Sequence, residues 1–487
     1  ARQSGGSYDS EQVLYDQVRF FIEPEGRCAL TAPRPLCIIS EYGSEANKQR
    51  NRAGFAKARK IYAFKDAAEK FVYIPTAGPH GYGRGHYRRF RRWLAEVMPP
   101  NAGTPESTGR RPTVSAGQIN ATKTGRVFYT RDLPNSRALF EVNARRIRTP
   151  LAYGERIATA ADARENAGKI VRTLRTLLEL PEGKFAARSV RPMGRAKLAG
   201  FAVEKLALET DPGVLVPAIL IRPAAKAGAK TPAVVWISHR GKGEVIRARW
   251  GELSKLLAAG VTVMAIDYRG AGETAPGTDL SFMGDETSLN GFGYRIGVPL
   301  IGMRVRDVLC SVEYLRGRPD VDPNRIALVG DSFSATNPAA IAQPRILTEE
   351  GRETIHRADS TAPAVTVLAL ALDERIAGAV TRGLLASYAS ICAQGYFYHP
   401  QGSFVPGILR HCDVADVAAS SAPRPLMLAG SVNGLNQALG ASAGSKGHLS
   451  RTARAYRLMR SADQLDIAPE AGQAKVVSFL RKALKAK

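Results

Sequence analysis

The stretch Arg-Ile-Ala-Leu-Val-Gly-Asp-Ser-Phe-Ser, from Arg325 to Ser334, decides the fold of this chain. Its first half, Ile326 to Val329, is an apolar run of the length and composition typical of a buried strand. Small residues, Gly330 and Ser334, lie two positions before and after Ser332. A serine flanked in this way at a sharp strand-to-helix turn forms a nucleophile elbow, whose hydroxyl stands clear of the sheet.

The stretch allows two interpretations of Ser332. As an elbow residue it would be a nucleophile, and the backbone N–H of Phe333 would help to stabilise an oxyanion. The elbow pattern is Gly-x-Ser-x-Gly, and Ser334 stands in place of its last glycine. The alternative is an ordinary turn in which Ser332 caps the following helix. We favour the elbow, because a predicted strand leads directly into it.

Apolar strands alternate with helices around this motif. Strand-like runs are predicted at 201–208, 215–221, 233–237 and 261–266, and amphipathic helices at 170–177, 253–257 and 305–312. Such alternation is typical of an α/β fold with an open, mostly parallel sheet flanked by helices. We expect residues 160–487 to form one complete domain of this kind.

A repeated segment organises the rest of the chain. Ala-Pro-Arg-Pro-Leu occurs at 32–36 and again at 422–426, each time leading into a short apolar strand. A helical stretch, a second strand and an amphipathic helix follow each copy. We therefore expect residues 1–100 to be the C-terminal portion of another such domain. Residues 101–159, rich in Gly, Pro, Thr and Arg, are expected to form a linker with short strands.

Two further motifs resemble those of the α/β hydrolases. Asp-Tyr-Arg-Gly-Ala-Gly at 267–272 is similar to the D-x-R-G-x-G turn of that superfamily, and His-Arg-Gly at 239–241 lies where its members place an oxyanion loop. With Ser332, these motifs make residues 160–487 resemble the acetyl-xylan-esterase and dienelactone-hydrolase-like branch. The whole chain resembles the tandem α/β-hydrolase proteins of environmental bacteria, many of them exported.

This resemblance implies several properties. The fold would be an α/β-hydrolase fold with a partial N-terminal copy, in a periplasmic or secreted bacterial protein. The backbone N–H groups of Phe333 and Arg240 would stabilise the oxyanion, and the reaction would need no metal or other cofactor. The pattern also requires a histidine after the last strand and an acid after the strand before it, because the serine needs an oriented base.

The required base and acid do not fall in the same copy as Ser332. The complete copy has Ala474 at the histidine position and Asn433 at the acid position. The partial copy has His80 after its last strand, and either Glu41 or Glu45 at the acid position. The candidate serine and the candidate histidine are therefore in different pieces of the chain.

Three interpretations of this split remain open. In the first, residues 160–487 are a degenerate hydrolase, and residues 1–100 remain from an active one. In the second, His80 reaches Ser332 across a domain interface, with a carboxylate such as Glu45 orienting it. In the third, a base inside the larger domain serves, and the candidates are His239, His356, His399 and His411. We rank the first ahead of the other two.

Composition excludes several classes of protein. The 487 residues are 44% hydrophobic and 23% charged, which favours packed cores over disorder. No apolar run reaches the roughly 18–20 residues of a membrane helix. Five scattered cysteines without a Cys-x-x-Cys pair argue against a disulfide scaffold or a zinc site. The net charge of +25 favours anionic partners, yet no nucleic-acid-binding module is recognisable, so a nucleic-acid partner is not expected.

The leading functional hypothesis is hydrolysis of a carboxylic ester, with Ser332 as nucleophile and His80 as base. For the substrate, the resemblance implies an acyl or uronoyl ester of a polysaccharide. The alternative is a degenerate scaffold or binding subunit that completes the site of another polypeptide, which Ala474 and Asn433 favour. A partial domain exposes strand edges and apolar surface. We therefore expect residues 1–100 to be covered by their own chain, a second copy or a second polypeptide.

Overall fold

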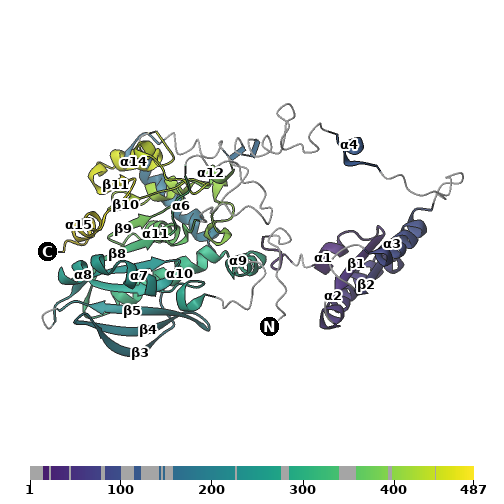
Figure 1. The fold of residues 1–487 in the computed structure, drawn as a ribbon, viewed down its shortest axis with the longest axis horizontal. Coiled ribbons are helices and arrows are strands. Elements are labelled where there is room, and N and C mark those ends of the chain that lie inside the picture. The colour runs from purple at the N-terminus through teal and green to yellow at the C-terminus, as the bar shows by residue number, and fades with distance from the viewer. Residues whose placement is uncertain are drawn as a thin grey trace. The chain divides into compact units, whose positions relative to one another are not determined.

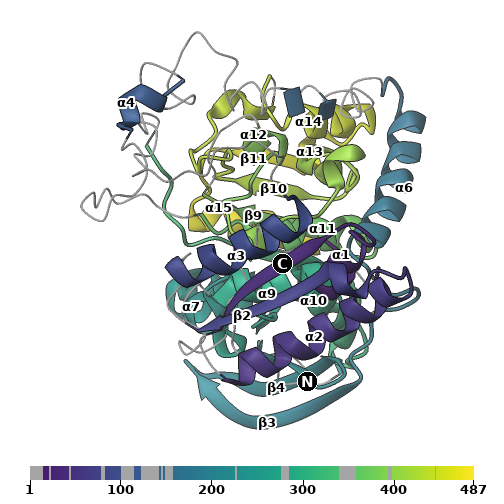
Figure 2. The same cartoon turned by 90° about the vertical axis from the view of Figure 1, so that its right-hand side faces the viewer.

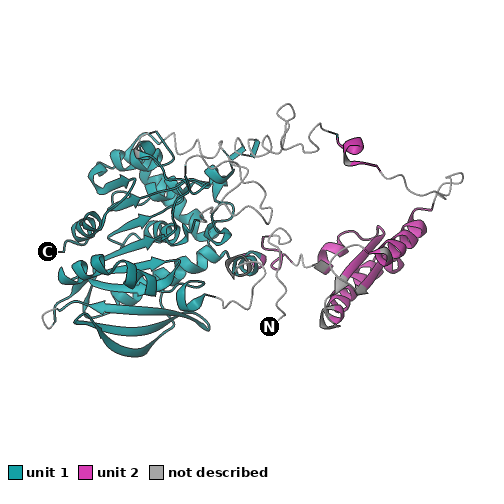
Figure 3. Ribbon diagram, in the orientation of Figure 1, with its two compact units in different colours: residues 1–13, 121–294, 298–487 teal, residues 14–120, 295–297 magenta. Residues whose placement is uncertain are grey.

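The computed structural model describes residues 15–20, 24–42, 45–77, 83–99, 114–121, 142–143, 146–147, 157–224, 228–275, 285–338, 358–392, 398–444 and 446–486. The chain forms two compact units (Figure 3). The larger comprises residues 1–13, 121–294 and 298–487, and the smaller comprises 14–120 and 295–297. The smaller unit thus extends past the predicted boundary at residue 100.

The larger unit contains a nine-stranded sheet in the order β11-β10-β9-β8-β6-β7-β5-β4-β3 (Figure 1). Its strands are β3 Ser189–Leu198, β4 Phe201–Asp211, β5 Val214–Arg222, β6 Thr231–Ser238, β7 Thr262–Ile266, β8 Val321–Asp331, β9 Gly378–Arg382, β10 Leu426–Ala429 and β11 Leu465–Ala468. Neighbouring strands from β7 to β11 are parallel, whereas β3, β4 and β5 pair antiparallel. The long strands β3 and β4 are strongly curved (Figure 2). The predicted mostly parallel sheet is confirmed.

Helices cover both faces of this sheet. From α6 onward they are α6 Ala160–Leu177, α7 Gly241–Ala248, α8 Trp250–Ala258, α9 Asp285–Arg295, α10 Leu300–Arg316, α11 Thr361–Leu372, α12 Ala389–Cys392, α13 Val414–Ala419, α14 Ser450–Leu458 and α15 Gln473–Leu484. Helices α6, α10, α11 and α13 contribute to the core on one face, and α7, α8 and α15 to the core on the other. No helix in the described part of the chain is long and apolar enough to cross a membrane.

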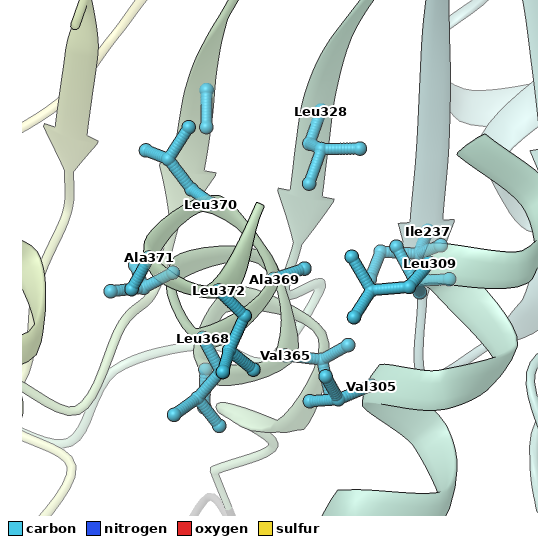
Figure 4. Packing of buried hydrophobic residues seen from close by; sticks show 14 of the residues in the cluster. Ile237, Val305, Leu309, Leu328, Val365, Leu368, Ala369, Leu370, Ala371 and Leu372 are labelled. Atoms are coloured by element: carbon cyan, nitrogen blue, oxygen red, sulfur yellow. The ribbon is translucent and has the colours of Figure 1, made fainter. Parts of the chain in front are cut away.

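The strand sequences explain this two-sided covering. Every residue of β6, β7 and β9 is buried, as expected for parallel strands with helices on both faces. In β8, Leu328 points into one core and Val329 into the other, because successive side chains alternate across a strand. Figure 4 shows the cluster to which Leu328 belongs, with side chains of α10 and α11 such as Val305 and Leu368.

Helix α11 lies unusually close to β8. All twelve of its residues are buried, in agreement with a sequence that is apolar on every side. A Cβ atom added to Gly330 would lie 2.3 Å from the Thr366 hydroxyl oxygen and 2.5 Å from the Ala362 carbonyl oxygen. Glycine at position 330 therefore allows the first turns of α11 to pack against the end of β8.

The smaller unit is built on two parallel strands, β1 Leu36–Tyr42 and β2 Phe71–Ala77. Its helices are α1 Pro24–Ala29, α2 Glu45–Ala63, α3 Arg84–Val97 and α4 Ala116–Ile119. Its small core contains Ala58, Tyr62 and Phe71. In the predicted linker, 101–159, the described residues form short helical pieces such as α4, and they contain no strand.

The two copies of the sequence repeat share local structure. Each consists of a parallel strand pair, β1 with β2 and β10 with β11. In the first copy the Tyr62 hydroxyl donates to the Arg34 carbonyl at 3.0 Å, and in the second the Tyr456 hydroxyl donates to the Arg424 carbonyl at 2.7 Å. That the smaller unit is part of a second hydrolase domain stays a prediction.

Candidate active site

Four parallel strands of the larger unit end in one row. Ser238 of β6 is the register partner of Asp331 in β8, Asp331 of Arg382 in β9, and Arg382 of Ala429 in β10. The loops after these strands therefore leave from the same edge of the sheet. In open α/β sheets, ligands bind at the carboxyl ends of the strands, so we place the candidate site at this edge.

Ser332 directly follows β8 and continues its extended course. Its backbone N–H donates to the Arg382 carbonyl at 3.0 Å, which prolongs the pairing with β9. Its φ angle is not positive, and residues 333–338 are not helical. Its hydroxyl oxygen accepts the Ser334 N–H at 3.3 Å. The predicted sharp strand-to-helix turn at Ser332 is therefore wrong, and its role as nucleophile stays a prediction.

Asp331 is fully buried and anchors the end of β8. Arg249 donates to both of its carboxylate oxygens, at 2.6 and 2.9 Å, and Arg382 donates to one of them at 2.9 Å. Arg382 also donates to Glu252 at 2.7 Å, and the Arg249 guanidinium lies 4.8 Å from the centre of the Phe333 ring. The Asp331 carboxylate is thus engaged by guanidinium groups, and it contacts none of the histidines that the structure describes.

A second serine lies at the start of α11. Ser360 is the N-cap residue of this helix and is only 1% exposed. Its hydroxyl makes no capping hydrogen bond; instead its oxygen lies 3.1 Å from Nδ1 of His399. On the other side of the imidazole ring, Nε2 lies 2.8 Å from the backbone carbonyl oxygen of Asn433. Ser360, His399 and Asn433 thus form one buried hydrogen-bonded chain.

The hydrogen-bond partners of His399 determine which of its ring nitrogens carries a hydrogen. A carbonyl oxygen can only accept, so Nε2 of His399 carries a hydrogen. In the neutral imidazole Nδ1 then has a free lone pair and accepts the hydroxyl hydrogen of Ser360. Burial lowers the pKa of His399, against smaller opposing effects of the Asn433 carbonyl and the Asp359 charge. The serine hydroxyl therefore faces an unprotonated base at neutral pH.

Asn433 occupies the position at which the sequence pattern requires an acid. Its side-chain oxygen accepts the N–H groups of Leu435 at 2.9 Å and of Gln437 at 3.0 Å, and its amide group donates to the Gln437 side chain. The side chain thus shapes its own loop, while the backbone carbonyl contacts His399. A backbone acceptor takes the place of the expected carboxylate.

The loop after β6 lies near the hydrogen-bonded residues Ser360, His399 and Asn433. Nδ1 of His239 is 4.0 Å from the Asp359 carboxylate, too far for a hydrogen bond. The other carboxylate oxygen of Asp359 accepts the N–H of Thr361, the first residue of α11, at 2.9 Å. The backbone N–H of Arg240, the predicted oxyanion donor, donates to the Ser238 hydroxyl oxygen at 3.2 Å. That amide is engaged within its own loop.

The other predicted residues contribute no observed contact to this site. His80 and His356 lie outside the described residues, and Glu45 is the first residue of α2 in the smaller unit. His411 is exposed, and Ala474 is exposed in the first turn of α15. Within the described residues, no group of three or more His, Cys, Asp or Glu side chains could hold a metal ion.

Sequence reasoning named His399 among four candidate bases but missed Ser360. One local signal was available. Asp359-Ser360 repeats the dipeptide Asp331-Ser332, and it directly precedes a predominantly apolar run suited to a buried helix. The decisive fact is a long-range contact, since α11 packs against β8 although Ser332 and Ser360 are far apart in the sequence.

Comparisons with known proteins agree with this architecture. No family model matches the chain. YtaP of Bacillus subtilis (strain 168), named as an inferred hydrolase, is 25% identical over 239 residues, which cover 46% of this chain and 67% of YtaP. A structure from Bacteroides fragilis, described as an inferred acetyl xylan esterase, superposes with a TM-score of 0.52 at 15% identity, covering 73% of this chain and 86% of that one. A glucuronoyl esterase from Solibacter usitatus gives a TM-score of 0.44 at 14% identity, covering 67% and 94%. With its strand order and two covered faces, the larger unit has the α/β-hydrolase fold.

Proposed function

We propose that this protein hydrolyses carboxylic esters through a serine of its larger unit. The proposal is carried by one observation: an α/β-hydrolase sheet brings serine hydroxyls and a buried imidazole to the carboxyl edge of its parallel strands. Ester hydrolysis by this route needs a nucleophile, a base and a water molecule. The larger unit supplies candidates for both protein groups, a serine hydroxyl for the nucleophile and an imidazole for the base.

For the substrate we propose an acyl ester of a polysaccharide. Acetyl esters come first, because the Bacteroides fragilis structure is described as an acetyl xylan esterase. The net charge of +25 suits an acidic glycan, which is the type of chain that carries uronoyl esters. We therefore expect acetylated, uronate-containing polysaccharides to be better substrates than neutral ones of equal length.

Two assays on the purified full chain test the proposal. We expect turnover of p-nitrophenyl acetate, and a single covalent adduct with a fluorophosphonate, seen as a mass increase of the intact protein. A fluorophosphonate reports an activated serine without knowledge of the substrate. A heat-unfolded sample is the control, because labelling must depend on the folded site. A folded protein that neither turns over the ester nor forms the adduct contradicts the proposal.

A second candidate function has its own observation. Ala474 is exposed where the superfamily pattern places the catalytic histidine, so the ordinary base position is empty. The chain would then be a catalytically degenerate scaffold that binds a ligand or completes the site of another polypeptide. Absence of both activities in a folded sample, with retained binding of an acetylated glycan, favours this candidate.

A further inference from the structure

We infer that Ser360, and not Ser332, is the nucleophile of the larger unit, and that His399 is its general base. This inference rests on the proposed ester hydrolysis and names the residues that perform it. It replaces Ser332 and His80, the leading pair expected from the sequence, and selects His399 from the other candidate bases. The evidence comes from the place of Ser360 in the fold, its hydroxyl, which makes no capping bond, and the orientation of His399.

The first argument is position. In the α/β-hydrolase fold the nucleophile lies between the carboxyl end of a strand and the amino end of the next helix. Here β8 ends at Asp331 and α11 begins at Thr361. The close approach of Ala362 to Gly330 shows that the amino end of α11 is nevertheless at this end of β8. Ser360 is the residue directly before the helix.

The second argument is that the Ser360 hydroxyl is available. An N-cap serine usually accepts a hydrogen bond from the second or third residue of its helix. The third residue here is Pro363, which has no N–H, and Asp359 already accepts the Thr361 N–H. The Ser360 side chain makes no capping bond and meets His399 instead. The Ser360 hydroxyl is therefore not used to cap the helix.

Within the part of the chain that the structure describes, Ser332 has no such partner. Its hydroxyl oxygen accepts the neighbouring Ser334 N–H, and its backbone extends the ladder of β8 and β9. Among the described residues, no histidine nitrogen is within hydrogen-bond distance of Ser332 in the structure. A serine hydroxyl is a weak nucleophile at neutral pH unless an adjacent base removes its proton.

The third argument is preorganisation. The Ala358 N–H donates to the Tyr398 carbonyl at 2.8 Å, and the Tyr398 N–H donates to the Gly434 carbonyl at 3.2 Å. These two backbone bonds join the segments that carry Ser360, His399 and Asn433. Ala358 lies two residues before Ser360, Tyr398 one residue before His399, and Gly434 one residue after Asn433. The serine and the base are thus held in place by main-chain hydrogen bonds as well as by their own contact.

The reaction follows from this geometry. The Ser360 oxygen bonds to the ester carbonyl carbon while Nδ1 of His399 takes the hydroxyl proton, and the carbonyl electron pair moves onto its oxygen. When the C=O bond re-forms, the alcohol oxygen leaves and takes the proton from Nδ1. Water then attacks the acyl-serine, gives a proton to Nδ1, and Ser360 recovers that proton as the carboxylic acid departs. The sum is ester plus water to acid plus alcohol.

Peptide mapping of the fluorophosphonate adduct tests the inference on the full chain. We expect the adduct on Ser360 in the parent and in S332A, and no adduct in S360A, whose kcat/KM for p-nitrophenyl acetate should fall about a thousandfold or more. An adduct on Ser332 that persists in S360A overturns the inference but leaves the proposed ester hydrolysis intact. Absence of any adduct from a folded parent overturns both.

The base is tested by a matched pair of histidine variants. H399Q keeps a polar side chain at the buried position, and we expect the same order of loss in turnover with a cooperative thermal transition retained. H411Q changes an exposed histidine and should leave turnover within twofold of the parent, a margin of about 0.4 kcal/mol. Full activity in folded H399Q shows that another group is the base.

Discussion

Burial sets the chemistry of His399. Its ordinary pKa of 6.5 is lowered chiefly by removal of the charged form from water, against smaller effects of the Asn433 carbonyl and of Asp359. A base acts in its neutral form, so ester turnover should rise with pH through this lowered value and be level at neutral pH. A pH profile of kcat/KM between about pH 4 and 8 measures it. A midpoint at or above 6.5 contradicts the assignment.

The same shift links pH to stability. Because the folded state binds the His399 proton less tightly than the unfolded state, the contribution is fully present above pH 6.5 and is lost as pH falls toward the lowered folded value. Urea denaturation of the parent and H399Q across this window isolates the effect. The parent should lose more stability than the variant on acidification, and equal losses would show that His399 titrates normally.

At the residue scale, the sequence indicated which residues lie near the site more reliably than what each residue does there. It placed Asn433 at the acid position, and that residue does contact the imidazole, but through a backbone carbonyl that no side-chain pattern can indicate. It could not choose His399 over His411, because the deciding facts are burial and hydrogen-bond partners. Both facts depend on which loops the folded sheet brings together.

At the scale of elements, the local patterns were sufficient for the strands. The apolar runs at 233–237, 261–266 and 326–329 became β6, β7 and β8, because a strand covered on both faces needs no polar alternation. The connection from β8 to α11 was not predicted, for a physical reason. The elbow pattern assumes that strand and helix are adjacent in sequence, whereas here α11 reaches β8 from residue 361 onward.

The contact between α11 and β8 yields a prediction of its own. In G330A the new methyl group would meet the Ala362 carbonyl, a backbone atom, so α11 must shift. We expect a loss of stability of about 1–3 kcal/mol, the usual cost of overpacking, and a fall in ester turnover because Ser360 moves with the helix. Urea denaturation and the p-nitrophenyl acetate assay measure the two effects.

The control for G330A is G243A. Gly243 lies inside α7, and an added Cβ there meets no atom within 4 Å. Replacement of a helical glycine by alanine in open space should be neutral or stabilise by up to about 1 kcal/mol. If G330A is as stable as G243A, the first turn of α11 does not pack on β8 as the structure has it.

At the scale of the whole molecule, the two units differ in how completely they bury their strands. All four residues of β10 are buried, and this strand has a partner on each side, β9 and β11. The first five residues of β1 are only half-buried, and among the described strands β1 pairs with β2 alone. Tyr87 and Phe90 of α3 are 55% and 40% exposed. Cover of residues 1–100 by the same chain, a second copy or a second polypeptide stays a prediction.

Hydrogen exchange of the purified full chain, read by mass spectrometry, puts that contrast to the test. A two-stranded sheet is marginally stable by itself, and weakly packed elements open at low free-energy cost. We expect peptides from β1 and β2 to exchange at least about tenfold faster than those from β10 and β11, an opening free energy lower by about 1.4 kcal/mol. Equal protection of the two strand pairs would mean that β1 is already covered in the isolated chain. Dilution then identifies the cover, because protection by a second copy falls with concentration and protection by the same chain does not.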